Sequence, residues 1–450
     1  MEPAGADTEG GGPSSNAQLR SLRERVVPRG ISTANPPVIA SATGSTWTDV
    51  DGTEWIDFTG GIGTLNAGAG HPAVVAAITA QAERLLHTCS HVAWHEPYLR
   101  LAARLSEMVP VEAPVKVMLC STGAEAVENA VKIARAATGR PLIVGFNAAF
   151  HGRTWMALSL TGKERPYRDG IGPFIAEVRH VAYGTTGPLR DLLAAEGEQV
   201  AAVIVEPVLG EGGFVIPEES FLPDVARLTR AAGALLIADE VQTGFGRTGR
   251  LFACEHTGVR PDIVVLGKSI AGGMPLAAVA GRAAVMDAPG PGVLGGTYAG
   301  NPVSCAAALA ICDLFADETL LEGARAVGAH ARTRLDAAVE AAGLRAEVRG
   351  LGAMVAVEFH DDAGGPATAV AAAVQAACAK RRLLTMRAGV DDNVLRLHCA
   401  LNIDRELLDR GLDLLADALD DAAVLAASEP TDTVAIAAAT VGDSMATGPS

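Results

Sequence analysis

The chain has 450 residues, and its 36 Lys and Arg against 52 Asp and Glu give a net charge of −16. About half of the residues are apolar and one fifth are charged, which excludes a disordered chain. The acidic charge argues against nucleic acid and anionic membrane surfaces as partners, because both are bound through clustered Lys and Arg.

Other features of the composition concern the compartment. The seven cysteines are scattered through apolar runs, unlike the dense cysteines of a disulfide scaffold. We find neither a secretory signal pattern at the N-terminus nor an apolar run long enough to span a bilayer. We therefore expect a cytoplasmic protein without membrane segments.

In chain order, residues 1–16 are mostly small and polar and are predicted to be a disordered lead. Residues 17–75, with strands at 46–48 and 55–58, are predicted to begin a small domain. Residues 76–308 are predicted to form a large domain. Its strands are expected at 115–120, 142–146, 200–205, 235–238, 263–266 and 277–280.

Most of these strands are apolar at consecutive positions, which is typical of strands covered on both faces. Helical periodicity at 124–137 and 221–232 separates several of them, which favours an α/β fold with a mostly parallel sheet wrapped by helices. Residues 309–427, with strands at 354–359 and 394–397, are expected to complete the small α+β domain. Residues 428–450 are predicted to be a flexible tail.

Three motifs in the chain are weaker than they look. Pro72 interrupts a loose dinucleotide fingerprint, and Asp262 replaces the first glycine of a P-loop that would end at Ser269. His87, His91 and His95 would share one face of a helix and resemble a zinc site, but the residues between them are poor helix formers. We place these histidines on a loop or helix edge and predict no metal site.

Lysine is scarce, so chemistry that needs a primary amine has few candidates. Lys268 directly follows the apolar strand 263–266 at the edge where ligands bind in such sheets. Desolvation there would lower its pKa and favour a nucleophilic amine, although a lysine that extends into solvent also fits the pattern. The other four lysines are each expected to keep the ammonium group in water: Lys116, Lys132, Lys163 and Lys380.

Three further groups are expected at the same edge. Asp239 ends strand 235–238, where a buried carboxylate requires a cation, although a capping role fits equally well. The turn around Gly123 opens a helix, as in an anion site or a well-capped helix. Phe150 and Arg153 lie on a loop after strand 142–146. An amine, a carboxylate, an anion cradle and an aromatic face together match the aldehyde, ring nitrogen, phosphate and ring of pyridoxal 5′-phosphate (PLP).

Six segments of the sequence also resemble the class III PLP-dependent aminotransferases of fold type I. The likeness covers about residues 39–414 and is greatest to bacterial 4-aminobutyrate aminotransferases. It rests on residues 122–130, 150–154, 206–214, 239–242, 268–273 and 295–302.

The resemblance implies roles for the residues that contact the cofactor. Lys268 would bind PLP covalently and shuttle the proton, and Asp239 would pair with the ring nitrogen. Thr297 would reach the phosphate in a neighbouring subunit, which implies a homodimer or a dimer of dimers. The remaining cofactor contacts would be Gly123, Ala124, Phe150, His151, Val241 and Gln242.

The resemblance also implies a substrate pocket. Arg396 would bind the α-carboxylate of one substrate, and Glu211 would pair with Arg396 when the substrate has no such group. Arg153 would bind the distal carboxylate, and Ile62 and Glu206 would contribute to the same pocket.

The implied reaction transfers an amino group from 4-aminobutyrate, or a close analogue, to 2-oxoglutarate and gives glutamate. The alternatives are 5-aminovalerate, ornithine or 2,4-diaminobutyrate as donor, another reaction on the same fold, or a non-catalytic regulator. Residues 90–95 and 398–401 depart from the family pattern, which leaves the amine donor open.

Overall fold

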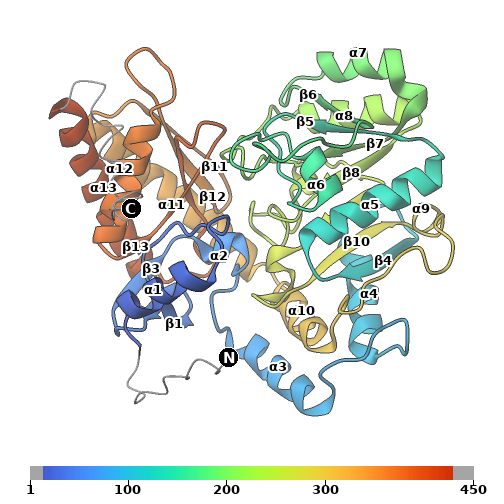
Figure 1. Ribbon diagram of the computed structural model, residues 1–450, viewed down its shortest axis with the longest axis horizontal. Coiled ribbons are helices and arrows are strands. Elements are labelled where there is room, and N and C mark those ends of the chain that lie inside the picture. Colours follow the sequence, from blue (N-terminus) through green and yellow to red (C-terminus); the bar gives the residue numbers. More distant parts are fainter. Residues whose placement is uncertain (1–13, 429–450) are drawn as a thin grey trace, which may run out of the picture.

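The computed structural model describes residues 14–428, which form the two lobes seen in Figure 1. One lobe contains a seven-stranded sheet in the order β4-β10-β9-β8-β7-β5-β6. The other lobe, coloured blue and orange to red, contains both ends of the described chain and two four-stranded sheets.

The seven-stranded sheet is mostly parallel, as predicted. Strand β10 runs antiparallel to its neighbours β4 and β9, whereas the pairs β5–β6, β5–β7, β7–β8 and β8–β9 are parallel. Strand β6 was not predicted, because Arg179 and His180 interrupt its apolar run. The strands are β4 (Val115–Cys120), β5 (Leu142–Phe146), β6 (Val178–Val181), β7 (Val200–Val205), β8 (Leu235–Asp239), β9 (Ile263–Leu266) and β10 (Ala277–Arg282).

Helices cover both faces of this sheet. In β7, Ile204 packs into the same apolar core as helix α5 (Gly123–Thr138), whereas Val203 and Val205 pack with α4 (Glu96–Met108) and α8 (Phe221–Ala231). This two-sided burial explains the consecutive apolar positions of the strands. The remaining helical elements here are α3 (Pro72–Arg84), α6 (Trp155–Leu160), α7 (Gly187–Glu196), η1 (Gly197–Gln199), η2 (Ala253–His256), η3 (Lys268–Ala271), α9 (Ala283–Met286) and α10 (Pro302–Leu314).

The second lobe joins the two ends of the described chain. Strand β3 (Glu54–Asp57) pairs in parallel with β13 (Leu383–Leu384), and Phe58 shares an apolar core with helix α13 (Arg405–Ser428). The predicted boundaries after residues 75 and 308 stay predictions. The other elements of this lobe are α1 (Asn16–Val26), β1 (Ile39–Thr43), β2 (Thr46–Asp49), α2 (Gly60–Gly63), α11 (Thr319–Ala342), β11 (Ala346–Leu351), β12 (Met354–Phe359), α12 (Thr368–Lys380), β14 (Met386–Ala388) and β15 (Val394–Leu397).

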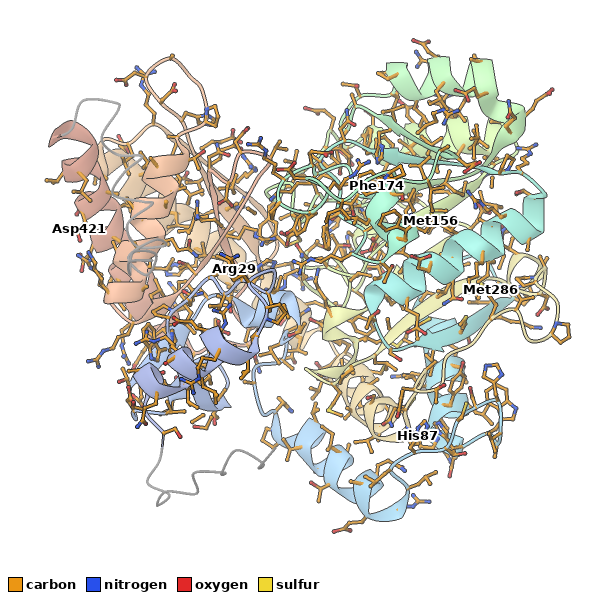
Figure 2. The ribbon with its side chains drawn as sticks, in the orientation of Figure 1. Arg29, His87, Met156, Phe174, Met286 and Asp421 are labelled. Carbon is orange, nitrogen blue, oxygen red and sulfur yellow. The ribbon has the colours of Figure 1, made fainter. Side chains whose placement is uncertain are left out.

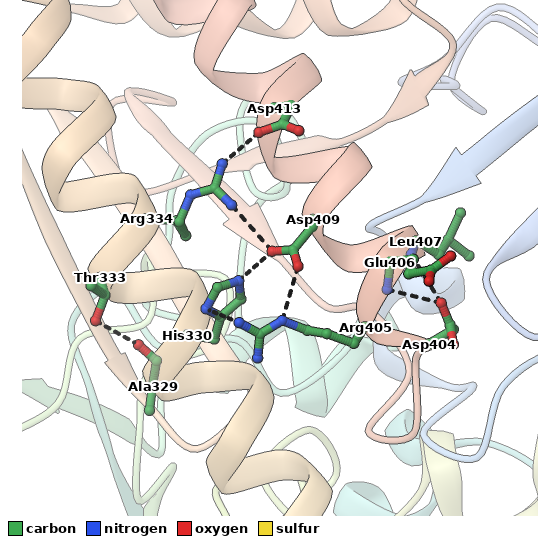
Figure 3. Close-up of polar contacts among 10 residues, drawn as sticks. All are labelled: Ala329, His330, Thr333, Arg334, Asp404, Arg405, Glu406, Leu407, Asp409 and Asp413. Carbon is green, nitrogen blue, oxygen red and sulfur yellow. Dashed lines mark hydrogen bonds and ion pairs between the residues drawn. The ribbon is translucent and has the colours of Figure 1, made fainter.

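A polar cluster links α11 to α13 on the surface of this lobe (Figure 3). Asp409 accepts from His330 at 2.5 Å, from Arg334 at 3.1 Å and from Arg405 at 3.0 Å, and Arg334 also pairs with Asp413. The hydrogen bonds from His330 and Arg405 lower the pKa of Asp409. The cluster fixes the register of the two helices outside their apolar contact.

The two predicted termini extend largely beyond the described range. Asn16, the last residue of the predicted disordered lead, is buried at the start of α1, and its side chain donates to Asp51 at 2.8 Å. The prediction is therefore wrong at Asn16, because this contact and the Ser15 cap order the chain. Residues 1–13 and the predicted tail after residue 428 lie outside the described residues. Among the described helices, none has the length and apolar character needed to cross a membrane.

Candidate active site

A cavity of about 460 Å³ lies where several central strands end. Its lining contains most of the predicted site residues, whereas Ile62, Thr297 and Arg396 are not part of the lining. The predicted residues that line it are Gly123, Ala124, Phe150, His151, Arg153, Glu206, Glu211, Asp239, Val241, Gln242 and Lys268.

The strand ends explain why distant residues meet. Glu206 follows β7, Asp239 ends β8 and Lys268 comes two residues after β9. Because β7, β8 and β9 are parallel neighbours, their carboxyl ends lie at one edge of the sheet. The sheet order thus places two carboxylates and an amine around the same cavity.

Asp239 meets a histidine partner inside the protein. Its Oδ2 lies 2.7 Å from Nδ1 of His151, and its Oδ1 accepts from the N–H of Val241 at 3.0 Å. Burial lowers the pKa of His151, but the hydrogen bond and charge of Asp239, with the charge of Glu206, outweigh this and raise the pKa overall. The contact with His151 compensates negative charge on Asp239, and the same side chain caps the turn that follows it.

The start of α5, where an anion cradle is predicted, lies at the cavity. Thr122 caps the helix by accepting from the N–H of Glu125 at 3.2 Å, and Gly123 and Ala124 line the cavity in the first helical turn. Gly152, with φ of 133°, allows the neighbouring loop to approach, since a Cβ there would lie 2.6 Å from the Cβ of Ala124. The positive end of the helix dipole therefore faces the cavity.

Lys268 lies in a tight turn after β9. Its backbone adopts the left-handed region with φ of 47°, which is strained for a residue with a side chain. Burial lowers the pKa of Lys268, and neighbouring Glu211 and Asp239 only partly oppose this effect. This partial desolvation agrees with the prediction and favours the neutral, nucleophilic form of the amine.

Arg396 and Glu211 form a buried ion pair beside the cavity. Nη1 of Arg396, on β15, lies 2.7 Å from Oε1 of Glu211, and the two side chains are 0% and 12% exposed. Burial raises the pKa of Glu211, but Arg396 and Lys268 outweigh burial and lower the pKa to about 2. Each charge therefore compensates the other, because either charge alone would be destabilising at this buried position.

An aromatic pair connects the predicted arginine to this ion pair. The rings of Phe150 and Tyr167 lie 4.7 Å apart, and the guanidinium of Arg153 lies 5.0 Å from the Tyr167 ring centroid. The hydroxyl of Tyr167 donates to Oε2 of Glu211 at 3.0 Å. Sequence reasoning missed Tyr167, because it lies on a long loop rather than at the end of a strand.

Glu206 is held by the backbone on both sides. Its Oε1 accepts from the N–H of Phe150 at 2.8 Å, and its Oε2 accepts from the N–H of Gly210 at 2.9 Å. Burial raises the pKa of Glu206 to about 7, although His151 opposes this effect. These bonds fix two loops of the cavity, and a direct role in substrate binding stays a prediction.

The prediction that Lys163 keeps its ammonium group in water is wrong. Lys163 is 4% exposed, and its Nζ donates to the backbone oxygen of Glu211 at 3.5 Å. The loop folds inward because the N–H groups of Gly162 and Lys163 donate to the oxygen of Ala149 at 2.8 and 3.2 Å. Burial lowers the pKa of Lys163, while Glu211 opposes this effect.

The histidine segment lies at the N-terminus of α4. His95 caps this helix by accepting from the N–H of Tyr98 at 3.2 Å, while His87 and His91 precede it on a loop, as predicted. No cluster of three His, Cys, Asp or Glu residues that could hold a metal ion occurs between residues 14 and 428. Among the departures from the family pattern, His398 is fully buried, and neither ring nitrogen has a partner within the described structure.

Comparison with known proteins supports this geometry. The family described as "Aminotransferase class-III" matches residues 31–419. The chain is 43% identical to the 5-aminovalerate aminotransferase DavT of Pseudomonas aeruginosa, over 91% of this chain and 99% of that protein. It is also 43% identical to the 4-aminobutyrate aminotransferase GabT of Escherichia coli K12, over 91% and 99% of the two chains.

A solved structure shares the fold. The ornithine aminotransferase of Toxoplasma gondii matches with a TM-score of 0.82 and 32% identity, over 90% of this chain and 95% of that one. The mostly parallel sheet with its lysine and carboxylate at the strand ends is that of the fold type I transferases. The chain belongs to the class III aminotransferase family.

Proposed function

We propose that this enzyme binds PLP and transfers the amino group of an ω-amino acid, 4-aminobutyrate or a close analogue, to 2-oxoglutarate. The buried pair of Arg396 with Glu211 carries this proposal. An arginine that a carboxylate can neutralise suits an enzyme whose two substrates differ in having an α-carboxylate. The relatives named for 4-aminobutyrate and for 5-aminovalerate are equally similar, so 5-aminovalerate is the second candidate donor.

The cavity has groups that fit PLP. Nε2 of His151 and Oε1 of Gln242 are buried and have no partner among the described residues, so both are available to a polar ligand. The N-terminus of α5 suits a phosphate, and Phe150 offers an aromatic face. Asp239 and Lys268 would hold the ring nitrogen and the aldehyde carbon.

The chain's own residues supply proton transfer and charge. When bound, PLP supplies an electrophilic aldehyde and an electron-withdrawing ring. Lys268, as a partly desolvated amine, accepts and returns the proton at the substrate carbon. Asp239, hydrogen-bonded to His151, would pair with the ring nitrogen and favour positive charge there. Arg153, at the exposed side of the cavity, would fix the distal carboxylate.

A donor panel tests the proposed substrate class. Wild-type enzyme loaded with PLP is assayed with 2-oxoglutarate as acceptor and 4-aminobutyrate, 5-aminovalerate, β-alanine, ornithine or 2,4-diaminobutyrate as donor. We expect the highest kcat/KM with 4-aminobutyrate or 5-aminovalerate. Exclusive use of the diamines, or of none of the five donors, would refute the proposal.

Glu211→Ser is expected to change which donors are accepted. Without Glu211, Arg396 has no ionic partner and stays available to α-carboxylates. We expect the kcat/KM ratio of glutamate to 4-aminobutyrate to rise about 10²- to 10³-fold, the range for loss of a partner from a buried charge. The ratio is measured in half-reactions by cofactor absorbance. An unchanged ratio would contradict the proposed role of Glu211 as the partner of Arg396 when the substrate has no α-carboxylate.

We also propose a homodimer or a dimer of dimers, in which Thr297 completes the partner's phosphate site. Thr297 lies on an exposed segment beside Tyr298, which is 67% exposed and stacks 4.9 Å from His87. Val92 and Trp94 on the adjoining loop are 83% and 62% exposed. Figure 2 places His87 at the outer edge of the larger lobe. Such clustered apolar exposure is typical of subunit interfaces.

Trp94→Glu is expected to dissociate this assembly and to abolish activity, because it places a charge in an apolar interface. Light scattering coupled to gel filtration measures the mass. The control is Val424→Glu, which puts the same charge on an exposed apolar position of α13 in the other lobe. A Trp94→Glu enzyme with the wild-type mass would contradict the proposed interface.

The cytoplasm is the compartment that we propose. All seven cysteines are free thiols, and six of them are buried in the folded chain. A reducing compartment suits a protein that keeps so many unpaired thiols.

A further inference from the structure

Under the proposed function, on which this inference rests, Glu211 parts from Arg396 in every catalytic cycle. We call the carboxylate without Arg396 the released state of Glu211. When Arg396 binds the α-carboxylate of 2-oxoglutarate, Glu211 loses the ion pair that compensates its charge. Its side chain is only 12% exposed, so water cannot replace Arg396 fully. A buried carboxylate without a partner is strongly disfavoured. Some other group must therefore receive it.

The structure contains such groups on the opposite side of the carboxylate. Arg396 contacts Oε1 of Glu211, whereas the hydroxyl of Tyr167 donates to Oε2 at 3.0 Å. Behind them, Nζ of Lys163 lies 3.5 Å from the backbone oxygen of Glu211 and 5.6 Å from the Tyr167 ring centroid. Oε1 of Glu211 thus pairs with Arg396, whereas Oε2 already has a different hydrogen-bond donor, Tyr167.

These groups are held in place independently of Glu211. The Tyr167 ring packs against Phe150 at 4.7 Å, and Arg168 donates to the oxygen of Thr161 at 3.1 Å across the same loop. Arg168 also lies 4.2 Å from the ring centroid of Phe174, which Figure 2 shows in the larger lobe. The loop is therefore ordered before the substrate arrives and needs no rearrangement to hold the carboxylate.

We propose that Tyr167, supported by Lys163, retains the Glu211 carboxylate when Arg396 turns to a substrate α-carboxylate. Tyr167 is then a positioning residue that sets the relative affinity of the enzyme for substrates with and without an α-carboxylate. In the paired state, Glu211 has both Arg396 and Tyr167. In the released state it keeps the hydrogen bond from Tyr167 and the nearby charges of Lys163 and Lys268, so loss of the hydroxyl affects the released state more.

Tyr167→Phe isolates the hydroxyl, because it keeps the ring that packs against Phe150 and Arg153. We expect the Kd of 2-oxoglutarate for the aminated enzyme to rise about tenfold, the scale of one hydrogen bond to a charged group. The KM of the ω-amino acid donor for the PLP form should change less than about threefold. Cofactor absorbance in separate half-reactions measures both values. Lys163→Met should shift them in the same direction.

Tyr183→Phe is the matched control. Tyr183 is half-buried, like Tyr167, and its hydroxyl donates to the backbone oxygens of Glu206 and Pro207 and not to the Glu211 side chain. We expect it to leave the ratio of the two affinities unchanged. Equal changes of both affinities in Tyr167→Phe would overturn the inference. A wild-type enzyme that uses no ω-amino acid would instead refute the proposed function.

Discussion

Lys268→Ala is expected to lower turnover by more than about 10⁴-fold, since proton transfer by a positioned side chain alone contributes up to about this factor. The covalent link with the cofactor is lost as well. Lys163 cannot substitute, because its ammonium group lies behind Glu211 and against the Tyr167 ring. Single-turnover absorbance with 4-aminobutyrate measures the loss.

Lys132→Ala is the control for Lys268→Ala. It removes the same charge from an exposed position on α5, where the ammonium group contacts only Asn129 at 3.4 Å among the described residues. This variant should keep wild-type turnover, and both variants should keep the fold as judged by circular dichroism. Appreciable turnover of Lys268→Ala would reject Lys268 as the reactive amine.

Asp239→Asn is expected to reduce kcat about 10²- to 10³-fold with little change in stability. The amide has nearly the same shape and can still accept from the N–H of Val241, but it carries no charge toward His151 or the ring nitrogen. Loss of one preorganised electrostatic contact to charge in the transition state costs about 10²- to 10³-fold in kcat. The absorbance of the bound cofactor should also titrate at a different pH.

Glu240→Gln is the matched control for Asp239→Asn. Glu240 is the adjacent residue and is fully buried, but its carboxylate accepts from the N–H groups of Ala253 and Cys254, away from the cavity lining. It should lower the melting temperature without moving the cofactor titration. If the two variants affected kcat equally, Asp239 would have no special role toward the cofactor.

The sequence predicts the central sheet well because its signal is local. Six of the seven strands were predicted from apolar runs; the structure buries β5, β7, β8, β9 and β10 almost completely and β4 only in part. The ends of β8 and β9 supply Asp239 and Lys268. Five strands were not predicted, namely β1, β6, β11, β13 and β14, and two of them show why. Strand β6 is interrupted by Arg179 and His180, and β13 has only two residues and depends on β3 for its existence.

The part of the site built by loops was harder to predict. Lys163 and Tyr167 occupy a polar stretch between α6 and β6, with no apolar period to place them. Their burial arises from backbone bonds to Ala149 and from packing against Phe150, both of which are tertiary contacts. The resemblance to a family identified Arg396 and Glu211 as partners, and the structure places them at 2.7 Å.

The pairing of β3 with β13 has a consequence during translation. Ile56 leaves the ribosome early, whereas its partner Leu383 emerges only when most of the chain has been made. Until then, β3 has an open edge, which is a ready template for intermolecular pairing. The seven-stranded sheet around Lys268 is complete once β10 has been made, whereas Arg396 follows only after α12. A nascent chain truncated before β13 would therefore contain Lys268 but not Arg396, the arginine proposed to select between substrates. Its open β3 edge would make it depend on chaperones to avoid aggregation.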